Sequence, residues 1–183
     1  MGHLIGLRLR LLLLLALLPV TGAALAQAER GELQIKATFL YKFGGFVDWP
    51  PGAFSAPDSA VTIGVIGADA LAAELERVAA GRNVQGRPVG VRRLKRNESL
   101  AGLHVLFVGQ GETARLDEIL QEAKGRPLLV VTESERSQPR GSMINFVTVE
   151  DRVRFDIALA PAERGNLRIS ARLLAVARKV ITG

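Results

Sequence analysis

The chain has 183 residues, a formal net charge of +6 and no cysteine. The missing cysteine excludes a disulfide framework and a lipoprotein acylated on cysteine. The basic residues are scattered, which favours a solubilising surface over a patch that meets an acidic partner or the anionic face of a membrane. No basic strand studded with aromatic residues and no zinc-finger spacing appears, so a nucleic-acid partner is not expected.

The first 26 residues have the three-part order of a secretory signal peptide. Arg8 and Arg10 precede the apolar run 11–18, and small residues follow up to Ala26. An apolar core of this length is too short to span a bilayer as a helix, which needs roughly 20 residues. We therefore expect cleavage after Ala26, which leaves one mature domain, residues 27–183, in the periplasm. Since Arg8 and Arg10 are removed with the signal peptide, the formal charge of the mature domain is 6 − 2 = +4.

The first half of the mature chain alternates helix and strand signals. Apolar residues at spacings of three and four predict a helix over residues 33–43. The segment Trp49-Pro50-Pro51-Gly52 then forces an irregular turn. Residues 61–66 are rich in β-branched side chains and predict a buried strand, and residues 70–80 again follow helical spacing.

The alternation continues as far as residue 132. Strands are predicted over residues 88–94, 103–108 and 128–132, with a helix over residues 112–124 that Gly125 and Pro127 terminate. This order predicts an α/β fold, a three-layer sandwich with a mixed, mostly parallel sheet.

The pattern changes after residue 141. Residues 143–149 and 153–159 are two alternating runs joined by a short polar turn, which predicts a C-terminal antiparallel hairpin. Residues 170–180 carry apolar side chains at helical spacing and predict a final helix.

Residues suited to catalysis are scarce. The one histidine of the mature chain, His104, stands inside the most apolar strand, where a satisfied core histidine is a better interpretation than a general base. No acidic cluster has metal-ligand spacing. The segment Gly64–Asp69 follows a strand and precedes a helix, but it lacks the spacing of a nucleotide-binding loop. We expect neither an enzyme nor a cofactor, although the crevice at the open end of the sheet leaves room for a small ligand.

Aromatic residues gather near the mature N-terminus. Phe39 and Phe43, four positions apart, suit the apolar face of a helix that docks on the core. Tyr41 and Trp49 are harder to bury at the same time, and both are residue types that interfaces favour. Core packing alone and a share in a partner contact both remain open, and the candidate partner-binding residues are Phe39, Tyr41, Phe43, Phe46 and Trp49.

Four segments, in order along the mature chain, resemble the YfiR-like family of periplasmic proteins. They are residues 35–50 (Ile35 to Phe43 and Phe46 to Pro50), His104–Val108, Gly141–Phe146 and Leu167–Arg178. Each match is modest, but the four together cover nearly the whole mature domain.

The resemblance implies an α/β homodimer that acts as a regulator rather than an enzyme. Such a protein inhibits an inner-membrane diguanylate cyclase, which makes cyclic di-GMP, and is itself sequestered by an outer-membrane lipoprotein. Family members often carry a cysteine just before the histidine of the middle strand, where this chain has Leu103. Disulfide-based control is therefore not available to it.

Two other functions compete with this one. A periplasmic small-molecule binder that reports to a membrane receptor such as a sensor histidine kinase is the first alternative. An exported hydrolase is the second, and the missing nucleophile and base argue against it.

Overall fold

The computed structural model describes residues 20–134 and 137–182. Most of the expected signal peptide, residues 1–19, lies outside the described residues. Residues 33–183 form one compact unit, and residues up to Glu32 belong to another. Within the described part, no helix combines the length and the apolar character that crossing a membrane requires.

The first described helix, α2 (Val20–Phe43), starts upstream of the predicted helix and ends where that prediction placed its end. In the compact unit its inward side chains Ala37, Leu40 and Phe43 are fully buried, at the spacing of one helical face. The short 3-10 helix η1 (Gly44–Phe46) follows and ends in extended backbone at Val47.

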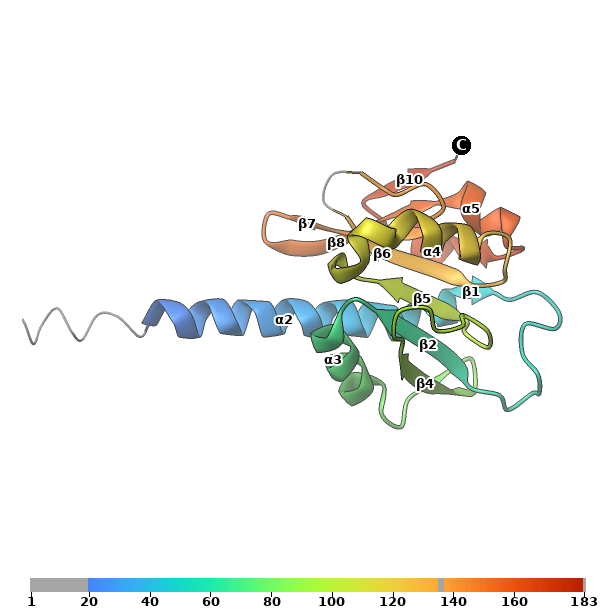
Figure 1. The fold of residues 1–183 in the computed structure, drawn as a ribbon, viewed down its shortest axis with the longest axis horizontal. Coiled ribbons are helices and arrows are strands. Elements are labelled where there is room, and N and C mark those ends of the chain that lie inside the picture. Colours follow the sequence, from blue (N-terminus) through green and yellow to red (C-terminus); the bar gives the residue numbers. More distant parts are fainter. Residues whose placement is uncertain (1–19, 135–136, 183) are drawn as a thin grey trace, which may run out of the picture. The chain divides into compact units, whose positions relative to one another are not determined.

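The central sheet has eight strands in the order β10-β8-β7-β6-β5-β2-β4-β3 (Figure 1). The strands β4, β2, β5, β6 and β7 are parallel neighbours, and β10 is parallel to β8. The β7–β8 and β3–β4 pairs are antiparallel. The bounds are β2 Val61–Ile66, β3 Asn83–Val84, β4 Arg87–Arg93, β5 Val105–Val108, β6 Leu129–Glu133, β7 Ile144–Val149, β8 Arg152–Ala158 and β10 Lys179–Ile181. The mixed, mostly parallel sheet and the hairpin are thus confirmed.

Alternation along the strands divides the core into two halves, one on each face of the sheet. In β5, Val105 and Phe107 pack in the cluster that includes α2 and α3 (Asp69–Ala79). Leu106 and Val108 pack in the other cluster, with α4 (Leu116–Ala123). The 3-10 helix η2 (Gln110–Arg115) leads into α4. Helices therefore cover both faces, which is the predicted sandwich.

The hairpin turns sharply between β7 and β8. Glu150 and Asp151 both have positive φ angles, of 50° and 56°. Two consecutive left-handed residues are the signature of a type I′ turn, whose twist matches that of the flanking strands. Such turns usually carry Asn-Gly or Asp-Gly, so two acidic residues here are unfavourable for the backbone.

The final helix is much shorter than predicted. After α5 (Leu159–Arg164), the chain forms β9 (Arg168–Ile169), which pairs with β1 (Val47–Asp48) in a separate small sheet. Helix α6 (Ala171–Leu174) is one turn, and residues up to 180 that were expected to continue it instead enter β10.

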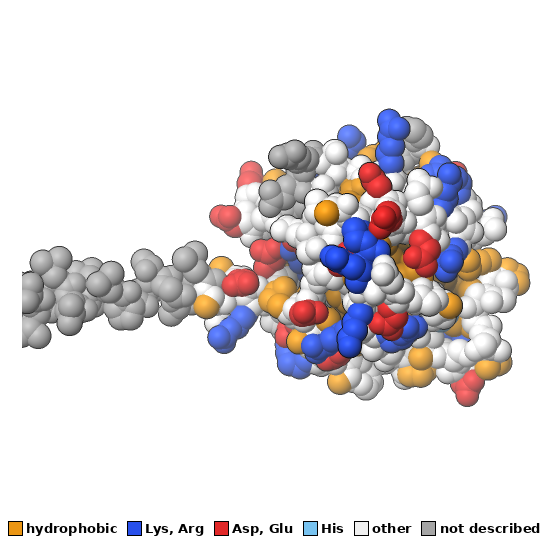
Figure 2. All heavy atoms as spheres, in the orientation of Figure 1, with side chains coloured by type: hydrophobic (Ala, Val, Ile, Leu, Met, Phe, Trp, Pro, Cys, Tyr) orange, Lys and Arg blue, Asp and Glu red, His pale blue; other side chains and the backbone are white. Residues whose placement is uncertain are grey.

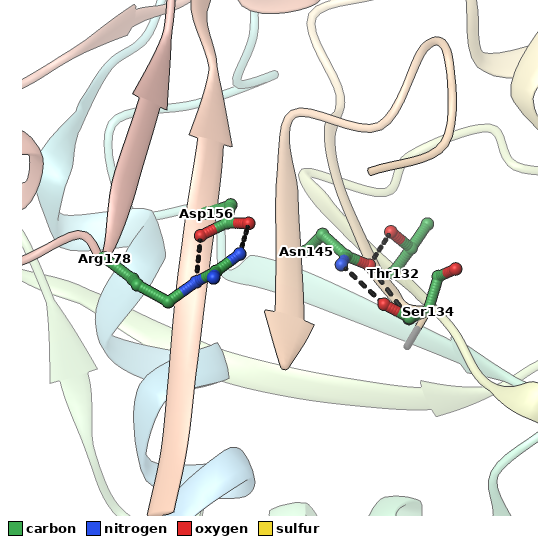
Figure 3. A network of polar contacts seen from close by, with 5 residues as sticks. All are labelled: Thr132, Ser134, Asn145, Asp156 and Arg178. Atoms are coloured by element: carbon green, nitrogen blue, oxygen red, sulfur yellow. Dashed lines mark hydrogen bonds and ion pairs between the residues drawn. The ribbon is translucent and has the colours of Figure 1, made fainter. Parts of the chain in front are cut away.

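Long-range pairing explains this correction. The Arg178 backbone N–H donates to the Phe155 carbonyl over 2.8 Å. The Arg178 guanidinium forms a two-pronged ion pair with the buried Asp156 carboxylate (Figure 3). Partners on β8 therefore override the local helical spacing of the C-terminal residues.

Candidate functional site

The carboxyl end of the parallel strands is where a ligand crevice is expected, between β2 and β5, because the chain leaves β2 toward β4 and leaves β5 toward β6, in opposite directions along the sheet. Here the loops after the two strands meet backbone to backbone. The Gly111 N–H donates to the Gly67 carbonyl over 3.1 Å, and a Cβ added at Gly109 would lie 2.5 Å from that same oxygen. Three glycines, Gly67, Gly109 and Gly111, thus fill the crevice with protein backbone.

A buried polar network closes the same end of the sheet beside β6. Asn145 accepts hydrogen bonds at its Oδ1 from the Thr132 hydroxyl and the Ser134 N–H, and its Nδ2 donates to the Ser134 carbonyl (Figure 3). Ser142 bonds Thr132 and is fully buried, as is Asn145. Lys36 of α2 adds an ion pair of 2.7 Å to Glu133. Each of these polar groups has a hydrogen-bond or ion-pair partner within the protein.

The amino end of the sheet is organised differently. The chain between β1 and β2, residues 49–60, forms a long loop at this end (cyan in Figure 1). The Phe54 ring stacks on the His104 ring at a centroid distance of 4.3 Å, and the Arg87 guanidinium covers Phe54 at 3.8 Å. The Trp49 ring meets the His104 ring edge to face at 5.7 Å. We name these four side chains, Trp49, Phe54, Arg87 and His104, the aromatic stack.

His104 is buried, as predicted, and both of its ring nitrogens are bonded. The Thr62 backbone N–H donates to Nδ1 over 3.1 Å, so Nδ1 must be unprotonated. Nε2 lies 3.1 Å from the Ala53 carbonyl, which can only accept, so Nε2 carries the proton. Burial lowers the pKa of His104; the Ala53 hydrogen bond opposes this shift, and Arg87 adds to it. The ring is therefore a neutral structural link between the loop and the sheet.

Arg87 holds the rest of the loop, and Gln85 holds the segment just before it. The Arg87 guanidinium donates to the Ala56 carbonyl over 2.8 Å and to the Ser59 carbonyl over 3.1 Å. Gln85 donates to the carbonyls of Gly45 and Val47. Turns within the loop bond the carbonyls of Pro50 and Ala56, and the Arg87 side chain from β4 supplies further donors.

Two surface hollows flank this loop. One has a volume of about 510 Å³ and the other about 470 Å³. Both are lined by Asp48, Trp49, Pro50 and Pro51, which therefore form a ridge between them, the Trp49 ridge. The lining of the first hollow also includes Phe54 and Arg87. The lining of the second also includes residues of α5 and β9, among them Glu163 and Arg168.

The aromatic candidates separate into two groups. Phe39 and Phe43 stack on each other at 5.8 Å and meet Phe155 at 5.3 and 5.2 Å, so they belong to the core. Phe43 is fully buried, whereas Phe39, like Tyr41, Phe46 and Trp49, is partly buried; its ring contacts set it apart from those three. The Trp49 Nε1–H donates to the Gly44 carbonyl over 3.1 Å, which fixes one edge of its ring. Of the five candidates, only Trp49 lines the two hollows.

Phe54, Arg87 and Gln85 were not singled out from the sequence. Phe54 lies in the same loop as Trp49, but Arg87 and His104 come from distant segments and meet Phe54 only through the fold. Gln85 likewise reaches the Gly45 and Val47 carbonyls from a distant segment. The one available signal was Phe54 itself, an aromatic residue in a loop rich in proline and small residues.

A third hollow, of about 280 Å³, lies at the end of α4. Its lining includes the cationic Lys124, Arg140 and Arg164, and cations beside a helix C-terminus complement its carbonyl groups. Basic and acidic side chains are interspersed over the face that carries α4 (Figure 2), as on a solubilising surface. Within the part of the chain that the structure describes, no three His, Asp or Glu residues are placed to hold a metal ion.

Comparison with known proteins agrees with the resemblance found in the sequence. A family model described as YfiR/HmsC-like matches residues 33–178 of the 183, and no curated protein matches the chain. The matched region includes the aromatic stack, the Trp49 ridge and every strand of the central sheet except β10. Family membership supports, at the level of the family, a periplasmic regulator of a diguanylate cyclase rather than a catalyst. The chain belongs to the YfiR/HmsC-like family.

Proposed function

We propose that this protein is exported to the periplasm and binds the periplasmic domain of an inner-membrane diguanylate cyclase, which it holds in an inactive conformation. A soluble inhibitor that prefers the inactive conformation lowers cytoplasmic output of cyclic di-GMP by its difference in affinity for the two states. The family membership supports this role, and so does the signal-peptide pattern of residues 1–26.

The observation that carries the proposal is the Trp49 ridge. Its tryptophan is held on one side by a hydrogen bond to Gly44 and on another by the His104 ring, so little side-chain entropy remains to be lost on binding. Pro51 is exposed and Pro50 half-buried, and proline adds a stiff apolar surface. A rigid aromatic anchor between two hollows suits a protein partner, because hot spots concentrate on tryptophan, tyrosine and arginine.

Three further parts belong to the proposal. The signal peptide is removed after Ala26. The mature domain forms a homodimer, and an outer-membrane lipoprotein sequesters it and so relieves inhibition. No cofactor takes part.

The test replaces Pro51 by arginine. Pro51→Arg places a long cation on the ridge, and we expect capture of the membrane cyclase to fall at least about tenfold, equivalent to about 1.4 kcal/mol. Pro57→Arg is the matched control, since Pro57 is an exposed proline of the same loop that lines neither hollow.

The cellular readout is the concentration of cyclic di-GMP. It should rise on deletion of the gene, return to the original level with the Pro57→Arg variant, and stay high with Pro51→Arg. Unchanged cyclic di-GMP on deletion, with no cyclase captured from solubilised membranes, would contradict the proposal.

A second candidate function rests on the size of the two hollows. Their volumes fall in the range of roughly 300–1,000 Å³ that is usual for small-molecule sites. The protein would then bind a periplasmic metabolite and report it to a receptor such as a sensor histidine kinase. A thermal shift with one class of metabolite, abolished by Pro51→Arg, would favour this function, because a ligand that binds only the native state raises its stability.

A further inference from the structure

We propose that His104 is a proton-operated latch: it fastens the loop 49–60 to the sheet while it is neutral and releases the loop on protonation. This inference rests on the proposed function, since the released loop carries the Trp49 ridge. It adds a regulatory input, the acidity of the compartment, to the site proposed for receptor binding.

The geometry makes the latch specific to one protonation state. Nδ1 accepts the hydrogen bond of the Thr62 N–H, and Nε2 donates to the Ala53 carbonyl of the loop. A second proton must go to Nδ1, where it would face another donor, the Thr62 N–H, at the present distance of 3.1 Å. The bond between the Thr62 N–H and Nδ1 is then lost. The His104 backbone stays in the sheet, where its N–H donates to the Thr62 carbonyl and its carbonyl accepts from the Leu129 N–H. The ring must therefore turn about its side-chain bonds to separate the two donors, and this rotation carries Nε2 away from the Ala53 carbonyl and so releases the loop.

The charges around the ring also oppose a second positive charge. The groups that face His104 are Trp49, Ala53 and Phe54 from the loop, Thr62 from β2 and Arg87 from β4. Among these groups Arg87 is the charged one, and it is a cation. It also stands over Phe54, the ring that stacks on His104. No carboxylate among them would stabilise an imidazolium.

The direction of the pH effect follows from these contacts. Burial, with Arg87 adding to it, lowers the pKa of His104 below its usual value of about 6.5. The folded, latched state therefore binds fewer protons than the open or unfolded state below that pH. The stability that the latch contributes is complete above about pH 6.5 and is lost as the pH falls through the lowered pKa.

Release of the latch changes the proposed binding surface directly. Phe54 and Arg87 line the larger hollow together with Trp49. Arg87 also bonds Ala56 and Ser59, so a shift of Phe54 from His104 removes one support from a loop whose other anchors lie on Arg87. Acidification is thus expected to reshape the larger hollow and to weaken receptor binding.

The chain carries its own reporter for this test. Trp49 is the sole tryptophan, and His104 is the one histidine of the mature domain. On the mature protein, tryptophan emission and acrylamide quenching are followed from about pH 8 to about pH 5, the range in which histidine changes charge. We expect a single transition with a midpoint below about 6.5 and a quenching constant that rises about twofold, while far-ultraviolet circular dichroism stays constant.

His104→Gln removes the titrating group, and its emission should not change over this range. NMR titration of the histidine ring in the unaltered protein gives an independent pKa, which keeps the test decisive if the variant does not fold. An NMR pKa at or above about 6.5, or a ring that titrates while Trp49 emission stays flat, would overturn the latch. No receptor is needed, so failure of the latch and failure of the proposed function are separate results.

Discussion

At the carboxyl end of the parallel strands, glycines bring two loops into backbone contact, whereas at the amino end a long loop rests on a stack of side chains. The first arrangement brings Gly67 directly against Gly109 and Gly111. The second leaves two hollows beside the Trp49 ridge. Proteins of this topology usually bind ligands at the carboxyl end.

The difference matters for the proposed function, which places recognition at the amino end, opposite to the usual one. Backbone contacts between glycines tolerate almost no change in side-chain size, so they suit a permanent structural seal. A loop held by ring stacking and by three hydrogen bonds from the side chains of Arg87 and His104 can be adjusted one residue at a time. We therefore expect substitutions at the carboxyl end to act on stability and those at the amino end to act on recognition.

The largest loss of stability is expected for Gly109→Ala. The new Cβ would lie 2.5 Å from the Gly67 carbonyl oxygen and 2.6 Å from the Ala68 Cβ, and backbone atoms cannot move aside cheaply. We expect a loss of about 3 kcal/mol in the free energy of unfolding, measured with urea. Gly90→Ala is the control, because its nearest neighbours are 3.9 Å away, and it should change stability by less than about 0.5 kcal/mol. Equal losses in the free energy of unfolding of the two variants would show that the glycine contacts at the carboxyl end have no special role in stability.

Asn145→Ala should come next, with a loss of about 2 kcal/mol. The substitution leaves the Thr132 hydroxyl and the Ser134 N–H and carbonyl without their shared partner in a buried site. Thr148→Ala, at an exposed position of the same strand, is the control. If the Ser134 amide exchanges hydrogen faster in Asn145→Ala but not in Thr148→Ala, the loss of stability comes from the broken polar network.

Phe54→Ala is expected to cost about 1 kcal/mol, because it removes one half-exposed ring from the aromatic stack. Its larger effect should fall on the loop, seen as greater acrylamide quenching of Trp49 at neutral pH. Phe54→Tyr keeps the ring between His104 and Arg87 and should behave as the original protein does. Unchanged quenching in Phe54→Ala would show that the stack does not hold the loop.

Pro51→Arg should have the smallest effect on stability, within about 0.5 kcal/mol, since Pro51 is exposed. The same variant is expected to have the largest effect on receptor capture. If Pro51→Arg lost receptor capture only in proportion to a loss of stability, the expected contrast between a carboxyl end that governs stability and an amino end that governs recognition would be wrong.

Much of this architecture follows from local patterns in the sequence. The β7–β8 hairpin and the buried strand β5 were predicted because alternation and β-branched runs are local signals, although β5 begins at Val105 and His104 lies just before it rather than inside it. The chain after Leu174 was predicted wrongly as helix, because the partners of Arg178 and Val180 lie on β8, more than twenty residues earlier in the chain. The aromatic segment pointed to Trp49, but the stack of Phe54, His104 and Arg87 joins three distant segments and carries no local spacing signal.

The turn between β7 and β8 offers a way to stabilise variants of the loop or ridge that fold too weakly to be assayed. Glu150 and Asp151 hold left-handed backbone conformations that cost roughly 1 kcal/mol each for residues other than glycine. An Asn-Gly pair at these positions would relieve that cost and remove two adjacent like charges. Because effects at distant sites add, this turn is a natural second-site suppressor. Loop and ridge variants too weakly folded for receptor assays could be rescued in that background without a change to the surface proposed to bind the partner.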